Sequence, residues 1–117
     1  MAMTLSEQRI GDVTLLRLGG RIVFGDGAPE LRTHINDLID EARLKFLIDL
    51  EDVTYMDSFG VGVIAAKYVS VRRKGGDMKL VCLSPRTHRV MRISGLLKIL
   101  ESFESKEDGL RSFGVTA

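Results

Sequence analysis

The hydrophobic positions near the start of the chain fall into short segments that are typical of strands. Thr4–Ile10 and Val13–Leu18 have the length and composition of two strands, and Gly11-Asp12 between them suits a tight hairpin turn. A short apolar run, Arg21–Phe24, follows, and the glycines of Gly25-Asp26-Gly27 permit the backbone angles of a sharp loop. The chain is therefore predicted to open with a β-hairpin.

Further along, hydrophobic residues recur at helical spacing in two segments. Pro29 suits the first turn of one helix, and its apolar stripe comprises Leu31, Ile35, Leu38, Ile39 and Ala42. The other helix is predicted from about Phe59 to Lys74, and its apolar face comprises Val61, Ile64, Ala65, Tyr68 and Val69. Basic residues at its end complement the helix dipole, and Gly75-Gly76 terminates it. We expect the first stripe to lie on a sheet.

Two nearly continuous apolar runs, Phe46–Leu50 and Met78–Leu83, are typical of central strands covered by helices. Ser84-Pro85 then supplies an N-cap and a first residue for a third helix that runs towards Gly95. Near the end, Ile99–Phe103 predicts a last strand. The S-x-x-D pattern Ser105–Asp108 is related to a capping box and predicts a short final helix.

This order of elements implies right-handed crossovers onto one sheet. We predict an α/β fold with a mixed, largely parallel sheet, an N-terminal β-hairpin and about four helices. A length of 117 residues with 44% hydrophobic content suits one compact domain spanning residues 1–117. No internal repeat or linker is present in the sequence.

Composition narrows the range of functions. The 17 basic and 16 acidic residues leave a formal net charge of +1, which gives no long-range attraction to nucleic acid or to an anionic membrane. No apolar stretch reaches the roughly 18 residues that span a bilayer, and the N-terminus lacks a signal-peptide pattern, so a cytoplasmic location is expected. Cys82, the single cysteine, lies in an apolar run and is predicted to be a buried thiol.

The segment from Leu50 to Ile64 joins a predicted strand to a predicted helix through Asp57-Ser58. The sequence Asp57-Ser58-Phe59-Gly60-Val61-Gly62 resembles the hallmark of the anti-sigma factor antagonist family, the STAS domains, in which Asp-Ser, a small residue, Gly, an apolar residue and Gly open a helix. The resemblance extends over nearly the whole chain. One departure is Phe59, which stands where the family usually has a small residue.

The resemblance implies a partner-switching function. In that family an anti-sigma factor with serine kinase activity phosphorylates the serine, here Ser58, and the unphosphorylated form binds this partner and releases a sigma factor. A serine phosphatase reverses the modification. By the same resemblance, the partner contacts comprise Asp26, Asp57, Ser58, Phe59, Gly60, Val61 and Gly62.

The residues themselves support such a switch. A phosphoserine adds about −1.5 to −2 charge, and at a helix N-terminus we expect it to meet free backbone N–H groups without unfolding the domain. Gly60 and Gly62 are expected to let a partner approach closely. Alternatives remain: Ser58 as a simple helix cap, Phe59 as a partner anchor or as a core residue, and Asp26 as a turn residue.

Other chemistries have weaker support in the sequence. The serine hydrolase motif G-x-S-x-G is incomplete in this chain, because Met56 stands in place of its first glycine. His88 is the only histidine after Ser58. His34 and His88 have no partners at metal-ligand spacing, Gly60-Val61-Gly62 is no nucleotide fingerprint, and no cofactor is predicted. Arg86, Arg89 and Arg92 form a helix stripe that suits either an anion or solvent. A STAS-type binding module in another system, such as a stressosome-like scaffold or a transport accessory, is the main alternative function.

Overall fold

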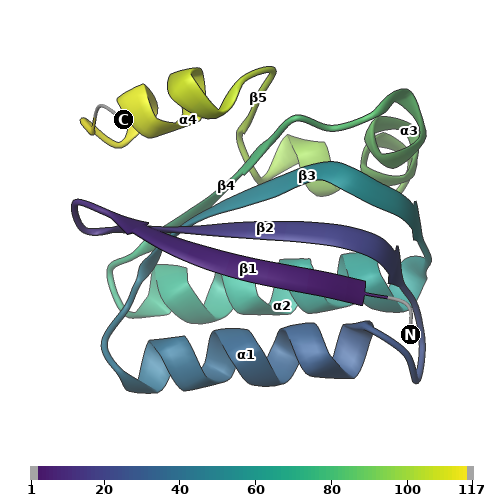
Figure 1. The fold of residues 1–117 in the computed structure, drawn as a ribbon, viewed down its shortest axis with the longest axis horizontal. Coiled ribbons are helices and arrows are strands. Elements are labelled where there is room, and N and C mark those ends of the chain that lie inside the picture. Colours follow the sequence, from purple (N-terminus) through teal and green to yellow (C-terminus); the bar gives the residue numbers. More distant parts are fainter. Residues whose placement is uncertain (1–2, 116–117) are drawn as a thin grey trace.

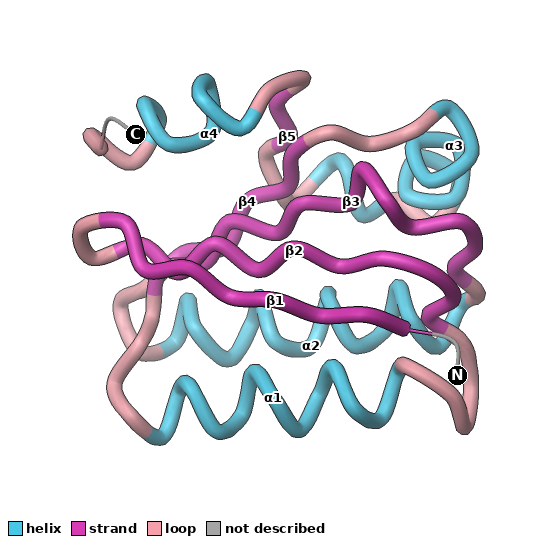
Figure 2. The backbone as a smooth tube through the Cα atoms, in the orientation of Figure 1, coloured by secondary structure: helices cyan, strands magenta, loops and turns pink. Residues whose placement is uncertain are grey.

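A computed structural model describes residues 3–115, which form one five-stranded sheet with helices on both faces (Figure 1; Figure 2). The strand order is β1-β2-β3-β4-β5, with β1 antiparallel to β2 and every other neighbouring pair parallel. The strands are β1 (Met3–Ile10), β2 (Val13–Ile22), β3 (Lys45–Met56), β4 (Asp77–Val81) and β5 (Ser102–Phe103). The helices are α1 (Ala28–Asp40), α2 (Ser58–Arg73), α3 (Pro85–Ile93), the 3-10 helix η1 (Leu96–Lys98) and α4 (Lys106–Ser112). The predicted α/β fold with its N-terminal hairpin is confirmed.

Helices α1 and α2 lie side by side on one face of the sheet, and α4 lies on the other (Figure 1). Successive side chains of a strand point to opposite faces, so β2 contributes Leu16 and Leu18 to the large core under α1 and α2, and Leu15 to the smaller core under α4. Because both of its faces are covered, the first half of β3 is a nearly continuous apolar run, interrupted only by the buried Asp49.

The ends of β2 and β3 bring two distant loops together. Ile22 pairs with Met56 in the parallel register, so both strands end at the same edge of the sheet. The backbone N–H of Asp57 donates to the carbonyl of Ile22 at 3.3 Å and extends this pairing by one residue. The loop after β2, which contains Asp26, and the start of α2, which contains Ser58, are therefore neighbours.

Several predicted boundaries are corrected. The strand predicted as Phe46–Leu50 extends to Met56, because its second half pairs with β2 alone and carries exposed polar residues that mask the strand pattern. The second strand, predicted as Val13–Leu18, extends to Ile22 and includes the first half of the short run Arg21–Phe24. The last strand contains only Ser102 and Phe103.

Three predicted core positions also differ from the structure. Ala42 lies beyond α1 in an exposed turn with φ 63°, and Val69 on α2 is 41% exposed. Cys82 is only half-buried, just after β4. Desolvation raises the pKa of this thiol, and the nearby carboxylates of Asp49 and Glu51 raise it further. Helical and strand periodicity identify an apolar face, but they do not show where the neighbouring elements stop covering it.

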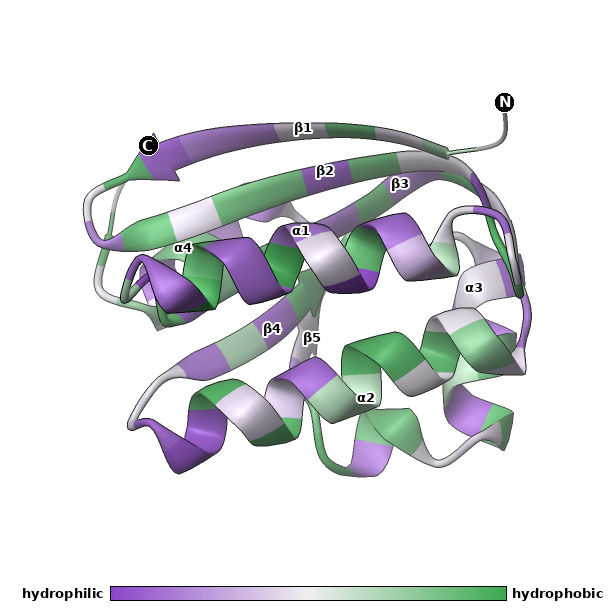
Figure 3. Ribbon diagram, turned by 90° about the horizontal axis from the view of Figure 1, so that it is seen from below, coloured by the Kyte–Doolittle hydropathy of each residue, from purple (hydrophilic) through white to green (hydrophobic). Residues whose placement is uncertain are grey.

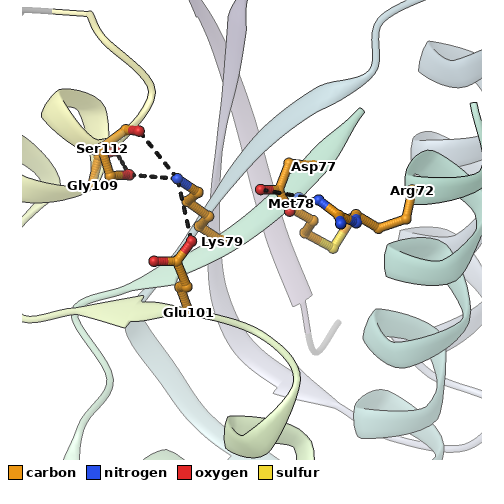
Figure 4. Close-up of polar contacts among 7 residues, drawn as sticks. All are labelled: Arg72, Asp77, Met78, Lys79, Glu101, Gly109 and Ser112. Carbon is orange, nitrogen blue, oxygen red and sulfur yellow. Dashed lines mark hydrogen bonds and ion pairs between the residues drawn. The ribbon is translucent and has the colours of Figure 1, made fainter. Parts of the chain in front are cut away.

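A buried lysine fastens α4 to the sheet, a feature the sequence analysis missed (Figure 4). Lys79 on β4 is 6% exposed, and its Nζ donates to the backbone carbonyl and to Oγ of Ser112 at 3.2 and 3.0 Å. The same Nζ lies 3.4 Å from Glu101 and 4.3 Å from the ring centre of Phe113. These contacts compensate the burial of the charge.

Among the helices that lie within residues 3–115, none combines the length and the apolar character that crossing a lipid bilayer requires.

Candidate functional site

Ser58 is the first residue of α2, and its side chain is exposed. Asp57 is the N-cap of the helix: its Oδ1 accepts hydrogen bonds from the backbone N–H groups of Phe59 and Gly60 at 2.9 and 3.0 Å. Within residues 3–115, the hydroxyl of Ser58 makes no hydrogen bond. The alternative in which Ser58 caps the helix is therefore wrong, and its hydroxyl is available to solvent.

Asp57 also connects α2 to the loop that contains Asp26. Its second oxygen, Oδ2, accepts a hydrogen bond from the backbone N–H of Phe24 at 3.0 Å. Within the loop, Asp26 exchanges two backbone hydrogen bonds with Val23, at 2.8 and 3.0 Å, and its side chain is exposed. Asp26 thus has the predicted turn geometry and lies in the loop that Asp57 holds beside Ser58.

Phe59 and Phe24 form an exposed aromatic pair beside Ser58. Their ring centres are 4.6 Å apart and their planes are tilted by 51°. Phe59 remains 54% exposed and Phe24 69% exposed. The alternative that places Phe59 in the core is wrong, and its role as a partner anchor remains a prediction.

A groove lies next to this aromatic pair, between the N-terminal halves of α1 and α2. Its volume is about 480 Å³, and it is lined by Phe24, Gly25, Ala28, Pro29, Arg32, Phe59 and Val63. No local sequence pattern predicts this groove, because its walls come from two helices and a loop that only the tertiary structure brings together.

The three residues after Phe59 differ in their accessibility to a partner. Gly60 is buried, and a Cβ atom built on it would lie 2.5 Å from the carbonyl oxygen of Ile22. Val61 is 7% exposed. The structure therefore corrects the expectation that Gly60 and Val61 contact a partner, because both pack against their own chain. Only Gly62 is exposed, with open space around its Cα.

The carboxylate of Asp57 has a perturbed pKa. Desolvation raises it, but hydrogen bonds from the backbone N–H groups of Phe24, Gly60 and Phe59 stabilise the charged form and together hold the pKa below its usual value. Two of the N–H groups that a phosphate on Ser58 was expected to meet are therefore already occupied by Asp57.

Replacing Asp57 is expected to destabilise the protein in a pH-dependent way. Asp57→Ala removes the cap and should lower the free energy of unfolding by about 1 kcal/mol near pH 7. Since the folded pKa is lowered, the contribution of the charge is present above the unfolded pKa of about 3.9 and is lost as the pH falls through the folded value. The difference in Tm between wild type and Asp57→Asn should therefore begin to shrink below about pH 4 and vanish once the pH is below the folded pKa of Asp57. A difference in Tm that stays constant down to acidic pH would contradict this expectation.

Other candidate residues lie away from Ser58. His34 pairs with Glu7 through Nε2 at 2.7 Å, and no histidine within residues 3–115 is hydrogen-bonded to Ser58. On α3, Arg86, Arg89 and Arg92 are exposed, and Arg86 donates to the carbonyl of Thr54 at 3.2 Å.

One group of possible metal ligands does occur in the described part of the chain. Asp49, Glu51 and Cys82 place one ligand atom each within 4.8 Å of one another. The guanidinium of Arg17 lies 3.8 Å from Asp49 and 3.3 Å from Glu51 and supplies a positive charge to this group.

Comparison with known proteins identifies the family. The model of the STAS domain family matches residues 5–109. The chain belongs to the STAS domain family. The match covers the sheet except for the first two residues of β1, and it includes the loop before α1 and the whole of α2, so the exposed Ser58 and its neighbours lie inside the STAS domain.

Several proteins that are similar to this STAS domain are anti-sigma factor antagonists. The anti-sigma F factor antagonist of Paenibacillus polymyxa is 30% identical over 126 aligned positions, which cover 100% of both chains. The crystal structure of an anti-sigma factor antagonist from Mycobacterium paratuberculosis superposes with a TM-score of 0.85 at 24% identity and covers 95% of this chain and 93% of that one. The structure of the Bacillus cell fate determinant SpoIIAA in its phosphorylated form has a TM-score of 0.75 at 20% identity, with 94% and 99% covered.

Proposed function

We propose that this STAS domain is an anti-sigma factor antagonist controlled by phosphorylation of Ser58. The unphosphorylated form binds an anti-sigma factor with serine kinase activity, and this binding releases a sigma factor. Phosphorylation of Ser58 by that partner ends the interaction, and a serine phosphatase restores it. The observation that carries the proposal is the free, exposed hydroxyl of Ser58 at the start of α2, next to a capping Asp57.

The surroundings of Ser58 suit a modification that changes the surface and leaves the fold intact. A phosphate adds about −1.5 to −2 charge, and the positive end of the α2 dipole tolerates it. Asp57 already binds the N–H groups of Phe59 and Gly60, so the phosphate is left pointing towards solvent and any docked partner. Together with Asp57 it forms a concentrated negative charge, which an acidic or apolar partner surface does not accommodate.

The proposed partner surface comprises the solvent-accessible residues around this point, of which Asp57 is partly buried and the others are exposed. It contains Asp57, Ser58, Phe59 and Gly62 at the start of α2 and Asp26 in the adjoining loop. The partner's ATP site supplies the phosphate, and this chain acts as a binding protein and a substrate with no catalytic role. We place this function in the cytoplasm, where ATP and sigma factors occur.

Incubation with ATP and the cognate serine kinase tests the proposal. We expect intact-mass analysis to show one added phosphate, and peptide mapping to place it on Ser58. Ser58→Ala should gain no phosphate, whereas Ser70→Ala, which changes a second serine of α2, should be modified like wild type. An active kinase that leaves Ser58 unmodified would defeat the proposal.

A further inference from the structure

The groove beside Ser58 is lined mainly by apolar residues, of which Phe24 and Phe59 are largely exposed. Phe59 and Val63 are one helical turn apart on α2 and line one wall, and Ala28 and Pro29 of α1 line the other. Phe24 completes the lining, and its ring contacts that of Phe59. Figure 3 shows α1 and α2 side by side, with hydrophobic residues gathered in the N-terminal half of α2.

The aromatic pair in this groove has the features of a binding hot spot. Two large rings remain more than half exposed although they are in contact with each other. Covering them releases water from a large apolar area, and aromatic residues at the centre of an interface contribute most strongly to affinity. The backbone N–H of Phe24 donates to Asp57 and fixes the backbone at Phe24, and its ring packs against that of Phe59, so the pair is formed before any partner arrives, which lowers the entropy cost of docking.

Arg32 adds a charge to this apolar site. It lies on α1, one turn after Ala28, and it is exposed. Among the ion pairs formed within residues 3–115, none includes Arg32, whereas two other basic residues, His34 on α1 and Arg43 after it, pair with Glu7. A guanidinium beside an apolar wall suits a carboxylate, which it can bind through two parallel hydrogen bonds.

We propose that this groove docks a segment of the anti-sigma factor in which a large apolar side chain is followed closely by an acidic residue. The apolar side chain packs against Phe24, Phe59 and Val63, and the acidic residue pairs with Arg32. This proposal rests on the proposed function and specifies the chemistry of its partner.

The arrangement also explains how the partner detects phosphorylation. Ser58 lies between Asp57, which holds Phe24, and Phe59, which forms the groove wall. A phosphate there places negative charge beside a site that selects an acidic segment. Arg32 attracts the negative charge of the partner's acidic residue, and a phosphate on Ser58 repels the same charge.

Binding measurements with charge-reversed variants test the groove. The probe is the purified anti-sigma factor that phosphorylates this chain, and its affinity is measured by isothermal titration calorimetry. We expect Arg32→Glu and Phe59→Ala each to weaken binding roughly tenfold or more, as hot-spot residues do. Arg73→Glu, the same change at an exposed arginine at the end of α2, is the matched control and should change affinity less than about twofold. Circular dichroism melts verify that each variant is folded.

A charge swap then identifies the acidic residue. Each acidic residue that follows an apolar one in the partner's interface is changed to lysine, and one such change should restore binding of Arg32→Glu. If Arg32→Glu and Phe59→Ala bind like wild type while Ser58→Asp does not, the groove proposal is overturned and the proposed function stands. If wild type itself neither binds nor becomes phosphorylated, the proposed function fails and the groove proposal fails with it.

Discussion

Ser58→Asp is expected to lower the affinity for the anti-sigma factor by roughly a hundredfold, about 2.7 kcal/mol, with almost no change in stability. The new carboxylate lies beside Asp57 at an exposed position, so a docked partner meets two adjacent negative charges. The fold is unaffected because the Ser58 hydroxyl makes no hydrogen bond within residues 3–115 and because a negative charge in the first turn of a helix is favourable. Surface changes of this kind alter the free energy of unfolding by about 0.5 kcal/mol or less.

Two variants separate charge from size in this experiment. Ser58→Asn has nearly the shape of the aspartate without its charge, and Ser58→Ala removes the hydroxyl. Both should bind the partner within a few-fold of wild type, and neither should be released after incubation with ATP. Equal affinities for the aspartate and asparagine variants in titration calorimetry would show that negative charge at Ser58 does not control docking.

Gly60→Ala is expected to lower the free energy of unfolding by about 2–3 kcal/mol. The added methyl group would lie 2.5 Å from the carbonyl oxygen of Ile22 and 2.7 Å from Cγ of Met56. Met56 has a flexible side chain that can move, but the Ile22 carbonyl belongs to β2 and accepts the hydrogen bond from Asp57. Helix α2 must therefore shift away from the sheet, and urea unfolding should show a lower midpoint.

Gly62→Ala is the matched control on the same helix. A Cβ atom built on Gly62 has no neighbour within 4 Å, and alanine loses less backbone entropy than glycine in a helix. This variant should therefore raise the free energy of unfolding by about 0.5–1 kcal/mol. If the two variants unfold at the same urea concentration, the close contact of Gly60 with β2 does not limit the packing of α2.

The contrast between Ser84, Ser105 and Asp57 shows which helix starts the sequence can predict. Ser84 and Ser105 each precede one helix as its only candidate cap, and both accept the predicted hydrogen bond, from Thr87 and Asp108 respectively. At α2 two good capping residues are adjacent, so the sequence pattern leaves the choice open. The structure selects Asp57, because its backbone N–H pairs with Ile22 at the end of β2.

The same limit explains the partner surface. The Asp-Ser pair and the glycines identify the segment, but they do not show which of its residues face outward. Gly60 and Val61 were predicted as partner contacts and are buried, whereas Phe24 and Arg32 were not predicted and line an exposed groove. Their roles depend on β2 and α1, which lie far from Ser58 in the sequence.

The sequence by itself determined the order of strands and helices, the hairpin, the caps of α3 and α4, and the place of Ser58 at a strand-to-helix junction. These features depend on residues within one or two turns of each other, so local patterns contain them. Only the tertiary structure decided that the Ser58 hydroxyl is free, that Gly60 is enclosed, and that Phe24 meets Phe59 beside Arg32. Each of these depends on the parallel register between β2 and β3, which brings together groups about 30 residues apart and is fixed by packing of the whole core.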